Sequence, residues 1–220
     1  ARLVAVAPWL RGLLSRPGDA DRAWRPPILR SRTDAEALTL AGAGELAGGT
    51  VITTDHLVRT GPRFAWVREP AWDDADLLRG QVEGALREWS EAYTAYLAAR
   101  ALPDGLTPFP ARPRVLVLPG LGVIAAGDSV EDADIALDIA LHDLQGRRRG
   151  LGVTDLLRDL HGLEPGPVPP TSFTIAIDTP ESMAARAAEA AGYPILKIKL
   201  GTARDLAMVE AVRSAAPARI

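Results

Sequence analysis

Lys197 and Lys199 are the residues of this chain whose type and spacing point most directly to chemistry. They are the only two lysines among 25 basic residues, and all the others are arginines. A lysine can lose its proton and act as a base, whereas a guanidinium stays charged, so lysine persists where arginine cannot replace it. The i, i+2 spacing puts both side chains on one face of a strand. The pair therefore predicts a proton-transfer site, with two solvent-facing lysines as the alternative.

A strand–helix–strand–helix series positions the two lysines. Residues 172–177 and 195–200 are expected to be strands, and Thr179, followed by a proline, marks a helix start. Thr202 and Asp205 are expected to open a second capped helix. Strands that alternate with helices over short loops run parallel, with right-handed crossovers. Two such units cannot close a barrel, which takes about eight strands.

Three segments around the lysines carry a resemblance to a known family. Residues 171–181 (TSFTIAIDTPE) and 194–201 (PILKIKLG) resemble the first two barrel units of dipeptide epimerases, the alanine–glutamate epimerase branch of the enolase superfamily. The preceding residues 140–147 resemble the helix that enters that barrel. The likeness covers residues 141–220 and implies an isomerase that acts on a dipeptide.

The resemblance also implies roles for individual residues. In dipeptide epimerases a lysine pair at the end of the second strand faces the substrate, which makes Lys199 the base that removes an α-proton and Lys197 its electrostatic neighbour. Substrate contacts are implied at Thr171 and Thr174. A nearby cation and partial removal from water favour the neutral amine that such a base requires. Barrel enzymes hold catalytic groups at the C-terminal ends of their strands, where the lysines stand.

The same resemblance implies Mg²⁺ as cofactor, but not a complete site. The family's carboxylate ligands lie on the third, fourth and fifth barrel strands, and its second lysine base lies on the sixth. None of these strands is expected in this chain, and residues 1–135 do not match the family's capping domain. Because Mg²⁺ is the main stabiliser of an enolate intermediate, we expect the chain to contain no metal ligands and to be inactive alone.

Residues 1–140 resemble a second family. The strings at 54–60 (TDHLVRT), 113–122 (PRVLVLPGLG) and 125–128 (AAGD) are similar to the class II aldolase portion of bifunctional rhamnulose-phosphate aldolase/short-chain dehydrogenase proteins. That likeness implies a sugar-phosphate substrate, with Zn²⁺ and NAD sites that would lie outside this chain. His56 is a candidate substrate-binding residue, although a single histidine is more often structural.

The two resemblances meet in a helix expected at residues 132–144, which fits both families. The predicted fold is therefore α/β: a mixed α/β aldolase-like fragment at residues 1–140, then the first two βα units of an incomplete (β/α) barrel at residues 141–220. Such a chain is a chimera or a truncated fusion. A helix tolerates the join because both parents share its pitch and apolar face.

The N-terminal part has its own expected elements. Residues 1–45 are expected to be mostly helical, with one helix at 33–46, and residues 51–53 to form a short strand. Apolar residues at three- and four-residue steps predict a long helix at 73–100. Residues 114–118 form a continuous apolar run, typical of a strand buried on both faces.

A dinucleotide-binding site is an alternative interpretation of Gly120 and Gly122, which follow the strand expected at residues 114–118. A phosphate-binding glycine loop must open a helix, because the helix N-terminus supplies the N–H groups. Here the apolar residues 123–126 predict another strand instead. The spacing therefore favours a turn between two strands.

Composition excludes several classes of protein. The net charge of -3 and pI near 5.7 argue against a nucleic-acid partner, and the lack of cysteine excludes disulfides and thiolate metal sites. The apolar residues 1–14 are interrupted by Pro8 and Arg11 and are too short for a membrane span, so the cytoplasm is the expected compartment. The expected partner is a small molecule, a dipeptide or a sugar phosphate, and the oligomeric state is left open. Three functions remain: an epimerase-derived chain, a lyase-derived chain, or a non-catalytic interaction module.

Overall fold

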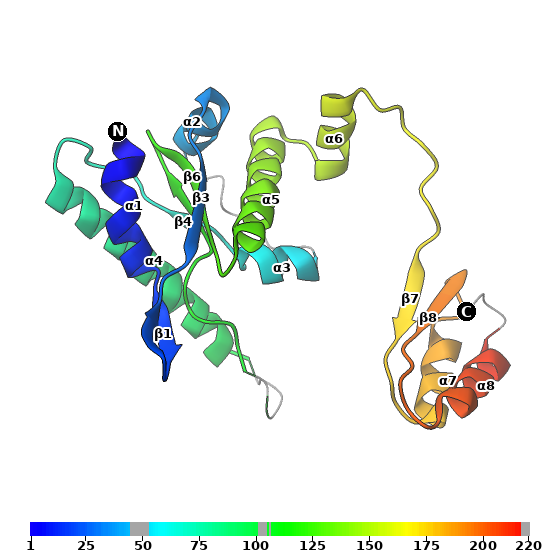
Figure 1. Ribbon diagram of the computed structural model, residues 1–220. Helices are drawn as coiled ribbons and strands as arrows, with labels where there is room; N and C mark the ends of the chain where they lie inside the picture. Colours follow the sequence, from blue (N-terminus) through cyan, green and yellow to red (C-terminus); the bar gives the residue numbers. More distant parts are fainter. Residues whose placement is uncertain (45–52, 101–104, 106, 217–220) are drawn as a thin grey trace. The chain divides into compact units, whose positions relative to one another are not determined.

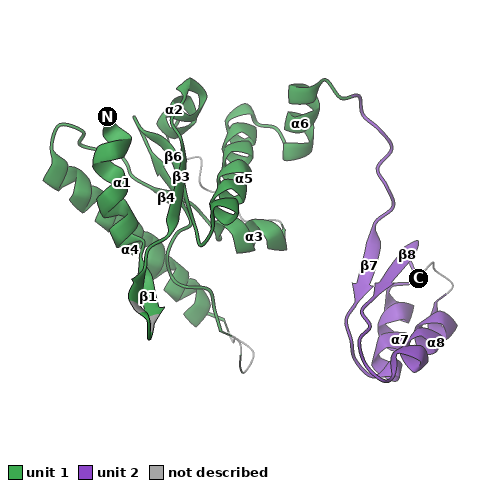
Figure 2. Cartoon of the chain, in the orientation of Figure 1, with its two compact units in different colours: residues 1–163 green, residues 164–220 purple. Residues whose placement is uncertain are grey.

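The chain divides into two compact units. A computed structural model describes residues 1–44, 53–100, 105 and 107–216. Residues 51–52 of the expected strand therefore lie outside the described part. Figure 2 shows unit 1, residues 1–163, in green and unit 2, residues 164–220, in purple. In the described residues, no helix is long and apolar enough to cross a membrane.

Unit 1 has three layers, with a four-stranded sheet in the middle (Figure 1). In spatial order the strands are β3 (Ile28–Arg32), β6 (Gly122–Gly127), β5 (Val115–Leu118) and β4 (Ala65–Trp66). Leu116 and Leu118 pack against α1 (Arg2–Leu13) and α4 (Ala75–Ala98). Val115 and Val117 pack against α2 (Ala35–Gly42) and α5 (Val130–Arg149) on the other face. β5 is therefore buried on both faces, which confirms the prediction from its apolar run.

The prediction of a mostly helical N-terminus is wrong for residues 16–32. These residues form a two-stranded hairpin of β1 (Arg16–Asp19) and β2 (Arg22–Arg25), followed by β3. β3 pairs antiparallel with β6 along its whole length, from Ile28 opposite Gly127 to Arg32 opposite Val123. A pairing partner about a hundred residues away satisfies the backbone here, and this overrides the local helix preference.

The glycines that suggested a nucleotide loop belong to a hairpin between β5 and β6. The two strands pair antiparallel, with Leu118 opposite Gly122, and Gly120 and Gly122 have φ of 78° and 120°. A Cβ at Gly122 would lie 2.1 Å from the Arg32 carbonyl oxygen. Only glycine fits there, because this conformation and this approach leave no room for a side chain. The expected turn between two strands is confirmed.

Helix α5 contains the proposed seam and runs without interruption. Ser129 caps it, and its hydroxyl accepts a hydrogen bond from the Asp132 N–H at 3.0 Å. Ala140 and Leu144 are both fully buried in the same core of unit 1. The physical division of the chain therefore follows residue 163, after α6 (Val153–His161), and not residue 140. A helix packed along its whole length cannot be divided between two units; that its sequence is a seam between two families stays a prediction.

Unit 2 has the predicted strand–helix–strand–helix order. Its parallel strands β7 (Ser172–Ile175) and β8 (Ile195–Ile198) alternate with α7 (Pro180–Glu189) and α8 (Asp205–Ala215). The two helices and the strands share a core that includes Ile175, Met183, Leu196 and Met208. None of the sheets in the described residues closes into a barrel. The α/β class predicted for both parts is confirmed.

The start of α8 differs from the prediction. Thr202 lies before the helix, which begins at Asp205. The Asp205 carboxylate instead accepts hydrogen bonds from the N–H groups of Gly201 and Thr202. It therefore closes the loop after β8 and makes the half of the predicted capping box in which the acidic side chain accepts the N–H of the threonine.

Two aspartates make the stability of unit 2 depend on pH in the acid range. A hydrogen bond from the Ser182 hydroxyl, with one from the Thr179 N–H, lowers the pKa of Asp178 below 3.8. Hydrogen bonds from Thr202 and Gly201 lower the pKa of Asp205 in the same way. Because the folded values are depressed, their contribution is complete above the unfolded value near 3.8 and is lost as pH falls below it.

We therefore expect the urea midpoint of unit 2, followed by NMR amide signals, to fall as pH drops from 5 to 3. Asp205→Asn should flatten part of this dependence and leave the midpoint of unit 1 unchanged. An equally steep pH dependence in the double variant Asp178→Asn, Asp205→Asn would contradict this assignment.

Candidate functional site

The two lysines lie on the uncovered face of the sheet in unit 2. In β8, Leu196 is 1% exposed and packs with Ile198 against the helices, whereas Lys197 is exposed. The ladder continues past the strand, because the Lys199 N–H donates to the Ile175 carbonyl oxygen at 3.0 Å. Lys199 is also exposed, so alternation puts both lysines on the face opposite the α7 and α8 side. We call this the lysine face.

β7 adds one predicted residue to the lysine face. Thr174 is exposed and directly opposite Lys197 in the parallel register, while its neighbour Ile175 is fully buried on the helix side. Directly opposite residues in a sheet point to the same side, so a hydroxyl stands beside an ammonium. Thr171 is exposed and precedes the strand, so the structure brings Thr174 and not Thr171 into the row with the lysines.

The acidic residues after the two strands are engaged in local structure. Asp178 accepts the Ser182 hydroxyl at 2.8 Å, and Asp205 accepts the Gly201 and Thr202 N–H groups. The described residues contain no group of three or more His, Cys, Asp or Glu side chains that could hold a metal ion. The Mg²⁺ that the epimerase resemblance implies, and the Zn²⁺ implied for the aldolase family, stay predictions. The lysine face presents two lysine side chains and one hydroxyl to solvent.

His56 lies in unit 1, on the short helix α3 (Thr54–Thr60). Its N–H donates to the capping Thr53 hydroxyl at 3.1 Å, and its carbonyl oxygen accepts the Thr60 hydroxyl at 2.8 Å. Its side chain is half-buried, and its neighbours Leu57 and Val58 line a cavity in unit 1. Both hydrogen bonds involve only the backbone of His56, so a substrate contact of its side chain stays a prediction, as does a structural role.

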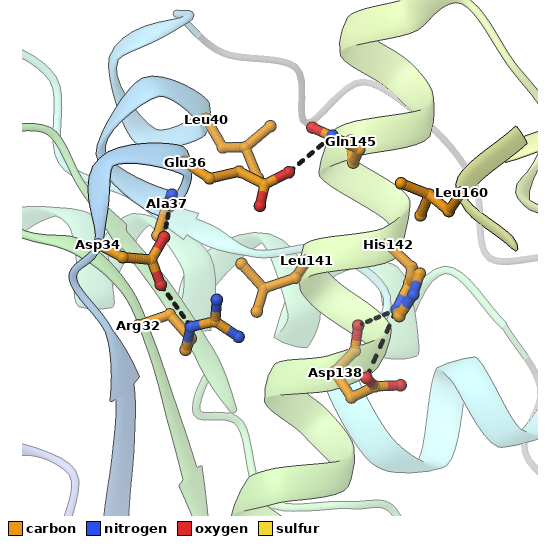
Figure 3. A pocket seen from close by; sticks show the side chains of 10 residues that line it. All are labelled: Arg32, Asp34, Glu36, Ala37, Leu40, Asp138, Leu141, His142, Gln145 and Leu160. Carbon is orange, nitrogen blue, oxygen red and sulfur yellow. Dashed lines mark hydrogen bonds and ion pairs between the residues drawn. The ribbon is translucent and has the colours of Figure 1, made fainter. Parts of the chain in front are cut away.

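A polar pocket that the sequence did not predict lies between α2 and α5 (Figure 3). It has a volume of about 190 Å³. The Gln145 amide donates to Glu36 at 2.8 Å, and His142 Nδ1 lies 3.5 Å from the Asp138 carboxylate. The i, i+4 spacing of Asp138 and His142 on one helix was a signal for part of it. The contact of Glu36 with Gln145 could not be predicted from the sequence, because it depends on how α2 packs on α5.

The polar groups of this pocket are mostly satisfied by one another. Arg32 donates to Asp34 at 2.6 Å, and Asp34 also caps α2 by accepting the Ala37 N–H. Gln145 Oε1 is buried and has no hydrogen-bond partner in the described structure. The pocket thus holds an acid–base pair of aspartate and histidine, but it contains no lysine.

Comparison with known families and proteins finds both kinds of protein that the sequence resembles. The model of the family "Aldolase class II, second domain" matches residues 1–153. An L-Ala-D/L-Glu epimerase of Bacteroides thetaiotaomicron is 45% identical over 83 residues, 37% of this chain and 21% of that protein. L-Ala-D/L-amino acid epimerases of Pedosphaera parvula and Maribacter sp. are 37% identical over 89 residues (39% of this chain, 24% of that protein) and 38% over 78 residues (36% and 22%). The chain spans about a fifth to a quarter of the length of these relatives. No solved structure matches it.

Proposed function

Because the chain belongs, through residues 1–153, to the family of the second domain of class II aldolases, we propose that it is a fusion of a lyase-family domain with part of a dipeptide epimerase. The epimerase part is residues 141–220, and its site is the lysine face. The relatives named L-Ala-D/L-Glu and L-Ala-D/L-amino acid epimerase support a dipeptide as the substrate class.

The observation that carries this proposal is the common face of Lys197, Lys199 and Thr174 at the ends of two parallel strands. In the reaction we propose, the neutral amine of Lys199 takes the α-proton, and the electrons of the broken C–H bond move into the adjacent carboxylate. The charge of Lys197 attracts the substrate carboxylate. Thr174 is placed to orient the substrate beside Lys197.

We propose that the chain by itself does not turn over. Removal of the α-proton places a second negative charge on the carboxylate group, and this step has the highest barrier of the reaction. Electrostatic stabilisation of that charge is the main way in which an enzyme lowers such a barrier. The described residues supply two cations on an exposed face, where water screens them, and no three-residue ligand set for a divalent ion. We therefore propose that the chain can bind a dipeptide without removing its α-proton.

The test is incubation of the full chain with Ala-Glu and Mg²⁺ in D₂O, with α-deuteration followed by NMR. We expect no exchange above the buffer rate. Exchange that disappears in Lys199→Ala would refute the inactivity and keep the base assignment, and exchange that survives this substitution would refute the base assignment as well.

A lyase activity is the second candidate, and the family match over residues 1–153 favours it. It would be detected as condensation of dihydroxyacetone phosphate with lactaldehyde in the presence of Zn²⁺. We expect none, because the described residues hold no cluster of Zn²⁺ ligands. Turnover that disappears in His56→Ala would make the lyase part the functional one.

A further inference from the structure

Unit 1 contains a second cavity, which is rich in arginine. It has a volume of about 200 Å³, and three arginines line it together with a single acidic residue, Asp128. Arg16 begins β1, Arg112 and Arg114 precede β5, and Asp128 follows β6. We call it the arginine cavity. It gathers cations in a chain whose net charge is -3.

The positive charge in the arginine cavity is only partly neutralised. Arg16 Nη2 lies 3.0 Å from Asp128 Oδ1, and Arg112 Nη2 lies 3.8 Å from the same oxygen. Arg114 is half-buried, and no carboxylate among the described side chains lies within ion-pair distance of it. Among the described residues, the cavity is therefore lined by three cations and one carboxylate, and only Arg16 and Arg112 lie within ion-pair distance of it.

The pKa of Arg112 is lowered, which indicates that its surroundings disfavour its positive charge. Burial lowers the pKa of Arg112, Asp128 raises it, and the neighbouring Arg16 and Arg114 lower it further. A guanidinium keeps its charge at neutral pH even so. Its Nη1 donates to the Leu14 carbonyl oxygen at 2.6 Å, which holds the side chain in place. An anion that entered the cavity would reduce the repulsion among the three guanidinium groups.

The remaining wall of the cavity is apolar and aromatic. Trp89 and Tyr93 on α4 stack with ring centroids 5.3 Å apart and are 3% and 8% exposed. Phe109 and Val58, which also line the cavity, are 49% and 39% exposed, so the cavity opens to solvent beside them. Small-molecule sites combine this kind of apolar wall with a few convergent polar groups.

We propose that the arginine cavity binds a small organic oxyanion, a phosphate monoester or a carboxylate carried on an aromatic or similarly flat apolar body. Arg112 and Arg114 bind the oxyanion, since guanidinium groups match phosphate and carboxylate oxygens with paired donors. The flat body packs against Tyr93 and Phe109. This site lies in unit 1 and is independent of the lysine face and of the proposed epimerase function.

Titration calorimetry on the full chain tests the proposal with phenyl phosphate, benzoate, inorganic phosphate and benzyl alcohol as probes. We expect saturable binding of phenyl phosphate that weakens with added salt, at least about tenfold weaker binding of inorganic phosphate, and none of benzyl alcohol. Benzoate that binds as tightly as phenyl phosphate assigns the site to carboxylates, and weaker binding of benzoate assigns it to phosphate monoesters. Failure of both organic anions to bind, or equal binding of benzyl alcohol, overturns the proposal.

Two variants locate the binding, each with a matched control. Arg114→Gln removes one cation and is expected to weaken phenyl phosphate about tenfold or more, the effect of losing a charge-assisted hydrogen bond. Arg87→Gln, at an exposed arginine of α4 outside the cavity, should have no effect. Val58→Phe fills the cavity without changing its charge and should also abolish binding, whereas Val153→Phe on α6 should not. Unchanged affinity in both Arg114→Gln and Val58→Phe, or an equal loss in the controls, overturns the proposal.

Discussion

Lys199→Ala is expected to lower the turnover of an active epimerase by about a thousandfold when the enzyme carries the lysine face of this chain. The recipient is the L-Ala-D/L-Glu epimerase of Bacteroides thetaiotaomicron, with residues 171–201 of this chain replacing the segment that aligns with them. Such a graft supplies the rest of the barrel, and general-base catalysis contributes about 10² to 10⁴ in rate. The measurement is α-proton exchange and epimerisation of Ala-Glu, followed by NMR in D₂O.

Further substitutions in the same graft separate the base from its neighbour. Lys199→Arg should be as inactive as Lys199→Ala, because a guanidinium keeps the positive charge but cannot accept the proton. Lys197→Ala should cost less, on the order of tenfold to a hundredfold, since it removes a charge and not the base. Thr174→Val should raise KM more than it lowers kcat if the hydroxyl orients the substrate. A graft that keeps its rate within tenfold after Lys199→Ala would exclude Lys199 as the base.

Gly122→Val is expected to destabilise unit 1 by about 3 kcal/mol or more, the largest effect on stability that we predict. The new Cβ would lie 2.1 Å from the Arg32 carbonyl oxygen, which is backbone and cannot move aside as a side chain would. The φ of 120° adds strain, because L side chains rarely adopt it. Relief of the clash requires β3 to separate from β6, which breaks the pairing of Arg32 with Val123.

Urea unfolding followed by tryptophan fluorescence measures this effect selectively, because all five tryptophans belong to residues 1–163. Gly80→Ala is the matched control: Gly80 lies inside α4 with nothing within 4 Å of an added Cβ. It should leave stability unchanged or raise it by up to about 1 kcal/mol, since alanine is the better helix former. A Gly122→Val protein that unfolds within 0.5 kcal/mol of the unsubstituted chain, a threshold set on the order of ordinary surface substitutions, would show that the hairpin accommodates a side chain.

Local patterns in the sequence were sufficient for the elements of unit 2 and for its candidate site. The i, i+2 spacing of the lysines, the capping Thr179 and the short loops all act over a few residues, so the predicted order of parallel strands and helices is confirmed. The same holds for α4, predicted at residues 73–100 and found at Ala75–Ala98.

The errors and omissions have one physical origin, which is contact between segments far apart in the chain. Residues 28–32 form a strand because β6 supplies their hydrogen-bond partners, and the local sequence does not predict that pairing. The division after residue 163 follows from the burial of Leu144 in the core of unit 1. A sequence pattern shows which residues share a face of one element, but not which element covers that face.

The sequence by itself therefore determined which side chains the lysine face presents, since side-chain type and strand period decide what a single strand presents. The tertiary structure alone decided where opposing charges and apolar walls meet. The arginine cavity draws Arg16, Arg114, Asp128 and Tyr93 from four separate segments of unit 1. Long-range packing brings these segments together, because burial of apolar surface stabilises the assembled fold and does not stabilise any one segment alone.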